Sequence, residues 1–129
     1  MSSLSWRVLA GQDFAGIVAR RRRNYRRLQD RLRDVAPTML GDLPPGVSPL
    51  FYPFLTDDRE RVQARLLAGG IEIGEFWPEW PAAVPRHEFP DVERLRRRAL
   101  WLPCHQDLSL PAIDRLAAAV ADVLDEVPR

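Results

Sequence analysis

The sequence predicts an α+β domain (an α/β sandwich) with a small three-stranded sheet, helices on one face of that sheet and a long N-terminal helix. Four stretches with apolar residues at helical spacing alternate with three short runs rich in branched and aromatic residues. The 129 residues match the size of one ordinary domain. Apolar residues make up 46% and charged residues 29%, which is typical of a globular chain. We therefore expect a single domain over residues 1–129.

The longest expected element is a helix over residues 13–36. Its apolar residues recur every three or four positions and form one stripe: Phe14, Val18, Tyr25, Leu28, Leu32 and Val35. Asp13 is a suitable N-cap, and Pro37 ends the helix. Such a rod is about 35 Å long, so we expect it to project past the core or to pack on a partner. Arg21 lies on the same stripe and needs either a carboxylate partner or a position at the edge of the stripe where its guanidinium can reach water. Arg21 and Tyr25 are the candidate partner contacts.

The expected α/β core covers residues 47–127 and follows a Pro/Gly loop over 41–46. Residues 47–55 are predicted to form a strand, and Pro49 and Pro53 make it an edge or bulged strand. A short helix over 58–67 begins at a capping box and ends at two glycines. Residues 71–75 form a second short strand.

The second half of the core repeats this alternation. A helix over 90–99 has acidic residues in its first turn and arginines in its last, which suits the helix dipole. Residues 100–102 form a buried strand, and a last helix begins at Ser109 and carries its apolar face to residue 127. The directions of the strands do not follow from the sequence.

Residues 76–81 form a stiff aromatic loop, because two prolines and two tryptophans in six residues exclude regular structure. Paired exposed tryptophans are costly unless they bury something. One interpretation is that Trp77, Glu79 and Trp80 form the wall of a substrate site completed by another domain or subunit. The alternative is that the loop only packs over the sheet.

The chain contains no lysine, and all 19 of its basic residues are arginine. It therefore cannot form a lysine Schiff base, and we assign it no catalytic, cofactor-binding or metal-binding residue. Cys104 and His105 are adjacent in an extended segment and point to opposite sides, so they do not form a nucleophile and base. A metal site would need further ligands, and His87 is the only other histidine.

Eight arginines between residues 20 and 33, against the single acid Asp30, suggest an alternative function. They could bind nucleic acid or an acidic partner. The net charge of +1 and the lack of an aromatic or glycine pattern typical of RNA modules argue against nucleic acid.

The single cysteine excludes an internal disulfide, which suits a reducing compartment. The N-terminus shows no basic-then-apolar signal pattern, and no apolar run approaches the roughly 20 residues of a membrane span. We therefore expect a cytoplasmic protein with no membrane partner.

Four stretches in order resemble the C-terminal small domain of the PLP-dependent sugar aminotransferases of fold type I, the DegT/DnrJ/StrS family. The four are Arg21-Arg22-Arg23-Asn24-Tyr25 with Leu28 and Leu32, Thr56-Asp57-Asp58-Arg59 leading to Gly70-Ile71, Phe89-Pro90 with Glu93, and Leu102-Pro103-Cys104-His105-Gln106-Asp107-Leu108-Ser109. In one respect the chain departs from the family: where many members have a histidine after the Gly-Ile strand, near the substrate, this chain has Phe76.

The resemblance implies that residues 13–36 are the linking helix and that the catalytic PLP domain, with its lysine, is absent here. It implies a domain that binds no cofactor alone, caps the active site and aids a homodimer. The partner is then a PLP-binding large domain, in a longer chain or in trans, and the parent reaction moves an amino group from a donor such as glutamate to a keto-sugar nucleotide. A further alternative is a stand-alone interaction domain that docks on an intact aminotransferase.

Overall fold

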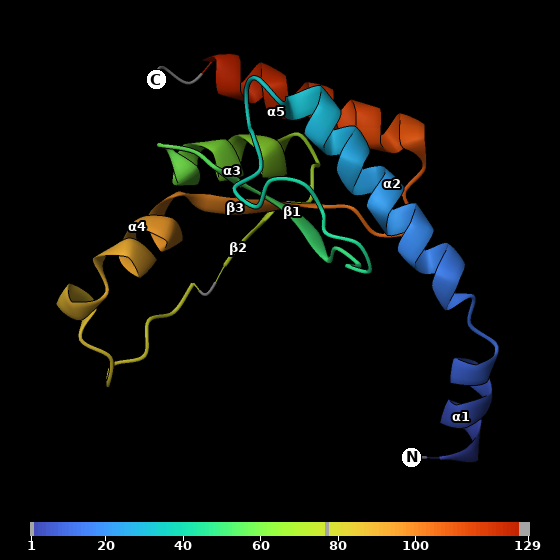
Figure 1. Ribbon diagram of the computed structural model, residues 1–129. Helices are drawn as coiled ribbons and strands as arrows, with labels where there is room; N and C mark the ends of the chain where they lie inside the picture. The colour runs from blue at the N-terminus through green and yellow to red at the C-terminus, as the bar shows by residue number, and fades with distance from the viewer. Residues whose placement is uncertain (1, 77, 127–129) are drawn as a thin grey trace.

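The computed structural model describes residues 2–76 and 78–126 (Figure 1). In chain order the elements are α1 (Ser3–Ala10), α2 (Phe14–Leu32), β1 (Phe51–Leu55), α3 (Arg59–Ala68), β2 (Gly74–Glu75), the 3-10 turn η1 (Arg86–Glu88), α4 (Pro90–Arg98), β3 (Ala99–Pro103) and α5 (Leu110–Glu126). No helix in the described part of the chain is both long and apolar enough to span a bilayer.

The three strands form one antiparallel sheet in the order β1-β3-β2. Tyr52 pairs with Leu102 and Phe54 with Leu100, and all four side chains are fully buried. Because side chains alternate along a strand, these four residues share one face, and their neighbours in sequence point to the other. The predicted α+β fold with a three-stranded sheet is thereby confirmed.

Three helices cover the buried face of the sheet. Figure 1 shows α2, α3 and α5 gathered on one side of the strands, while α4 lies apart from them at the lower left. The helices contribute fully buried or nearly buried side chains to one core: Tyr25, Leu28 and Leu32 from α2, Val62 and Leu66 from α3, and Ile113, Leu116 and Val120 from α5. The helical spacing seen in the sequence thus selects Tyr25, Leu28 and Leu32 correctly, but Phe14, which it places on the same stripe, is 56% exposed.

Buried polar ties join α2 to the segment that precedes α5. The Asn24 side chain is fully buried, and its Nδ2 donates to the carbonyl oxygens of His105 at 2.8 Å and Leu108 at 3.1 Å. Arg21 Nε donates to Gln106 Oε1 at 2.8 Å and Arg21 Nη1 to the Pro49 carbonyl at 3.3 Å. The arginine on the apolar stripe is therefore satisfied by an amide and a carbonyl rather than by a carboxylate.

An ion pair also joins α2 directly to α5. Arg27 contacts Asp114 at 2.7 Å, and Arg31 contacts the same carboxylate at 3.1 Å. The hydrogen bond from Arg27 holds the pKa of Asp114 below its usual value, and the same hydrogen bond raises the pKa of Arg27. The two helices are thus joined by hydrogen bonds and charge as well as by apolar packing.

The observed boundaries differ from the expected ones at several points. The helix over 13–36 was the first one predicted, but a shorter helix, α1, precedes it, and Ser2 caps α1 through a bond from the Ser5 amide to its side chain. The long helix ends at Leu32 rather than 36, and the residues that follow turn so that Ala36 enters the core. The first strand begins at residue 51 rather than 47, after Pro49, and it tolerates Pro53 because β1 is an edge strand, as predicted.

The second strand is also shorter than expected. It pairs only over Gly74 and Glu75, whereas a strand over 71–75 was predicted. Gly70 adopts a positive φ of 73°, which ends α3 sharply, and Ile73 enters the core from outside the sheet. Gly74 lies directly under the Trp101 indole, whose Nε1 would be 2.7 Å from an added Cβ. Only glycine allows β2 to approach β3 this closely.

Candidate functional site

The face of the sheet opposite the core carries an aromatic cluster. The rings of Phe51 and Trp101 stack with centroids 4.2 Å apart, and Phe76 meets Phe51 edge-on at 6.2 Å. Trp101 Nε1 donates to the Glu75 carbonyl at 3.3 Å, which ties the cluster to β2. These residues come from β1, β3 and the segment after β2, so the strand order brings the aromatic loop against the open face.

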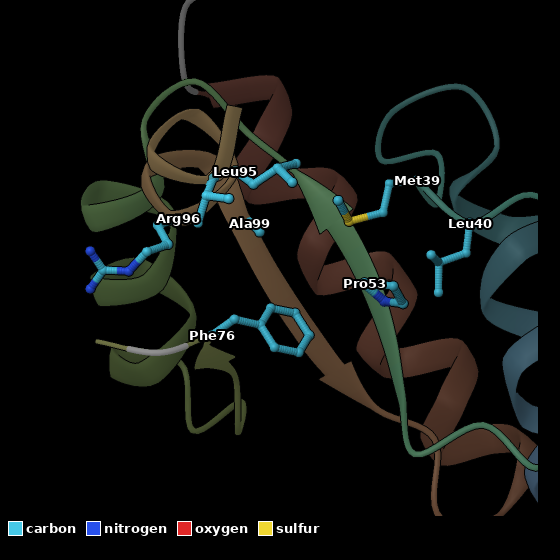
Figure 2. Close-up of a pocket in the computed structure, with 8 residues that line it drawn as sticks. Met39, Leu40, Pro53, Phe76, Leu95, Arg96 and Ala99 are labelled. Atoms are coloured by element: carbon cyan, nitrogen blue, oxygen red, sulfur yellow. The ribbon is translucent and has the colours of Figure 1, made fainter. Parts of the chain in front are cut away.

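An apolar hollow of about 600 Å³ lies on this face. Its lining residues come from the loop after α2, the two long strands, α4 and the segment after β2: Met39, Leu40, Pro53, Phe76, Val92, Leu95, Arg96 and Ala99. Figure 2 shows the Phe76 ring turned toward Pro53, whereas the Arg96 guanidinium points away from that strand. Apart from Arg96 the lining is apolar, which suits apolar side chains of a partner better than a polar sugar.

The rim of the hollow is unusually exposed for large apolar residues. Leu40 is 66% exposed, Val92 45% and Leu95 38%. A contiguous exposed apolar patch of this kind marks an interaction surface in soluble proteins. These residues were not predicted as a site, although the three-residue spacing of Val92 and Leu95 on an otherwise charged helix indicates an apolar face.

The aromatic loop holds itself in a defined shape. Trp77 lies outside the described residues, Glu79 is exposed and Trp80 is half-buried. Trp80 Nε1 donates to the Val84 carbonyl at 2.5 Å, and the loop has no strand or α-helix between residues 78 and 85. The predicted absence of regular structure is confirmed for this described stretch.

Of the two candidate partner contacts, only Arg21 keeps some exposed surface. Tyr25 is fully buried, its hydroxyl lies 2.9 Å from Thr38 Oγ1, and its ring is 5.2 Å from that of Tyr52. Burial raises the pKa of Tyr25. In this fold Tyr25 therefore belongs to the core and offers no side-chain surface to a partner.

The arginines of the long helix are largely used within the chain. Arg21 bonds Gln106, and two other arginines of α2 pair with Asp114. Arg22 donates to the carbonyls of Pro44 at 2.8 Å and Val47 at 2.6 Å. These bonds fasten the Pro/Gly loop to α2. The internal contacts reduce the positive patch that a nucleic acid or an acidic partner could use.

Cys104 and His105 do not form a catalytic pair. Burial raises the pKa of the Cys104 thiol to about 11, so it is neutral at physiological pH. His105 Nδ1 instead lies 3.7 Å from a carboxylate oxygen of Asp107. Among the described residues no group of three or more His, Cys, Asp or Glu side chains could hold a metal ion.

Comparison with known proteins identifies the fold. The model of the DegT/DnrJ/EryC1/StrS aminotransferase family matches residues 12–121. No curated protein matches the chain in sequence. Similar solved structures include the aminotransferase TlmJ from Streptoalloteichus hindustanus, which is 27% identical with a TM-score of 0.66 over 85% of this chain and 32% of that one.

Two further structures share the fold at lower identity. DesV of S. venezuelae, solved with a ketimine intermediate, has a TM-score of 0.73 at 22% identity and covers 87% of this chain and 33% of its own. A GDP-4-keto-6-deoxymannose-3-dehydratase with a trapped PLP-glutamate geminal diamine has a TM-score of 0.61 at 18% identity, over 82% of this chain and 31% of that one. The chain thus spans about a third of the length of each.

Proposed function

The chain belongs to the DegT/DnrJ/EryC1/StrS aminotransferase family, and from this premise we propose that it is the small domain of a PLP-dependent sugar aminotransferase. Its role is to cap the active site that a PLP-binding large domain supplies and to aid dimerisation. The observation that carries this proposal is the apolar hollow on the open face of the sheet, in a chain that spans only about a third of its relatives' length.

The residues of this chain do not fit a lysine-bound PLP, because none of them is lysine. The cofactor, which supplies the electron sink for amino transfer in such enzymes, therefore belongs to the proposed partner domain. This chain contributes two contact surfaces: the open face of the sheet, on which the large domain docks, and the loop after β2, which contacts the substrate. A chain that covers only a third of a relative needs a surface for the rest, and the hollow is an apolar surface of the described chain that is open to solvent.

Within this proposal the loop of Trp77, Glu79 and Trp80 faces the substrate. Glu79 is exposed and can accept hydrogen bonds from sugar hydroxyls. Arg21, at the base of the long helix, is the proposed contact with the partner. Phe76 packs at the start of the loop, where its ring turns toward Pro53 (Figure 2).

The docking role is tested with the PLP-binding part of a family aminotransferase from which the small domain has been removed. We expect the chain to bind this part and to restore amino transfer from glutamate when the two are fused. Leu95→Arg places a charge at the rim of the hollow and should abolish binding. Ala118→Arg is the matched control, because Ala118 is exposed on α5, which covers the other face.

Two outcomes would overturn the proposal. One is an L95R variant that binds as well as the A118R control. The other is stable binding of PLP by the pure 129-residue chain, followed by the visible absorbance of the bound cofactor after gel filtration, which would show a cofactor site in a chain without lysine. The reading frame upstream of Met1 distinguishes a large domain in the same chain from a partner in trans: a lysine-containing PLP domain there selects the first.

A further inference from the structure

Arginine side chains fasten the substrate-facing loop at both of its ends. At the start of the loop, Arg59 of α3 contacts Glu75 at 2.6 Å, and the two side chains are only 20% and 25% exposed. Arg59 Nη1 also donates to the Arg96 carbonyl at 2.7 Å. That carbonyl lies in the last turn of α4, where helical carbonyls lack an intrahelical partner. Arg59 thus joins the end of β2 to the end of α4.

Arg96 carries the connection from α4 into the loop. Its Nη2 donates to the Pro78 carbonyl at 2.8 Å, and its guanidinium lies 5.1 Å from the centroid of the Trp80 ring. Arg86 lies over the same ring at 5.8 Å. Both distances are within the range of cation–π attraction. The residues on either side of Glu79 are therefore held by one guanidinium, while Glu79 itself is exposed.

The rest of the loop supplies little that could replace this fastening. Residues 81–90 are all exposed, so the apolar burial that normally orders a chain is missing there. Within the described part of the loop, the hydrogen bond from Trp80 to Val84 is local and closes only a short turn. The loop's position relative to α4 and the sheet must then come mainly from Arg96 and, behind it, from Arg59.

We propose that Arg96 is a positioning residue that holds Glu79 in place as the hydrogen-bond acceptor for a polyhydroxylated ligand, with Arg59 fixing Arg96 from behind. The proposal rests on the proposed function, since it assigns a ligand class and a support to the same loop. Arg96 acts through the Pro78 carbonyl and the Trp80 ring and does not itself touch the ligand. Glu79 is the specificity residue, because a carboxylate can accept two hydroxyl hydrogen bonds at once.

Hydrogen exchange of the isolated chain tests the support. Arg96→Met keeps the apolar stem that lines the hollow and removes the guanidinium. We expect exchange of the Val84 amide, which donates to the Pro81 carbonyl at 3.0 Å, to rise about tenfold, because a charge-assisted hydrogen bond and a cation–π contact that hold the loop are lost. Arg96→Lys should restore part of the protection, since it keeps a cation over Trp80. Arg94→Ala is the control: Arg94 pairs with Asp91 on the same helix and is exposed.

Wild-type exchange of the Val84 amide in R96M would overturn the positioning role. If R96M unfolds, which circular dichroism would show, R96K decides: protection below wild type supports the proposal, and protection equal to wild type contradicts it. These outcomes concern the isolated chain and do not depend on docking to a large domain.

The acceptor role is tested in the fused enzyme described above. We expect R96M and Glu79→Gln each to raise KM for the sugar substrate about tenfold with little change in kcat, as loss of one good polar contact would. The double variant should be no worse than either single one, because the two residues act on one contact. Unchanged KM in an active fusion would overturn this inference alone, whereas a fusion without activity would overturn the proposed function.

Discussion

Replacing Asn24 with alanine removes the buried link between the long helix and the segment before α5. Asn24 has no exposed surface, and its Nδ2 bonds two carbonyls, those of His105 and Leu108. Each hydrogen bond contributes about 1 kcal/mol net, and the part-buried Leu108 carbonyl left unpaired costs about 1 kcal/mol more, whereas the His105 carbonyl still accepts from the Leu108 amide. We therefore expect the free energy of unfolding to fall by about 3 kcal/mol, which lowers Tm by about 10 °C in a domain of this size.

The assay is urea unfolding of the isolated chain, followed by tryptophan fluorescence and by circular dichroism. A lower midpoint with an unchanged slope would show lost stability rather than a changed denatured state. Arg23→Ala is the control, because Arg23 is exposed and reaches only Asn24 Oδ1, at 3.3 and 3.4 Å. An N24A variant within about 0.5 kcal/mol of wild type would refute the reasoning, since that is the usual effect of a surface change.

Three further predictions concern single groups. Asp114 has a lowered pKa in the fold, so its stabilisation is present above the unfolded value of about 3.9 and is lost as pH falls through the folded value. The urea midpoints of wild type and Asp114→Asn should therefore differ at neutral pH and converge in acid, and a constant gap would contradict the ion pair. The Cys104 thiol, with its pKa near 11, should react with a chromogenic disulfide at pH 7 at least about 100-fold more slowly than in the urea-unfolded chain; equal rates would show an open thiol. Gly74→Ala should cost about 1–3 kcal/mol in urea unfolding because its Cβ meets the Trp101 ring, whereas Gly11→Ala, which has only ordinary contacts, should not; equal losses would locate the strain elsewhere.

The sequence predicted the elements whose signal is local and repeated. The helical stripe of Tyr25, Leu28 and Leu32 and the short alternating runs of β1 and β3 are such signals, and the structure places these residues in the core. The first helix, α1, was missed because it is only eight residues long and none of them is buried. The length of β2 was overestimated because its pairing is limited by the indole of Trp101, which is distant in sequence.

The candidate site was harder to predict because its residues come from separate segments. The hollow unites Met39, Pro53, Phe76 and Leu95, and only the strand order β1-β3-β2 brings them together. The sequence left strand directions open, so it could not place these side chains on one face. The aromatic loop was recognised from its tryptophans and prolines, but its support by Arg96 depends on α4 folding back against it.

The two faces of the sheet are built in different ways, and this difference bears on function. On the helix-covered face the polar groups find partners within the chain, as Asn24 and Asp114 do. On the open face, large apolar side chains such as Leu40 and Val92 remain exposed around a hollow. A domain evolved to act alone would gain stability by covering that surface, whereas a domain that docks must keep it apolar.

The arginine-rich helix supports the same conclusion from another direction. If phosphate binding were its role, its guanidinium groups should remain available to solvent. Instead Arg21 and Arg22 fasten neighbouring loops, and Arg27 and Arg31 share one carboxylate. These four arginines therefore stabilise the domain itself. Because the chain has no lysine, any amino transfer linked to it must be completed by residues that it does not contain, and the open face is the surface proposed to meet them.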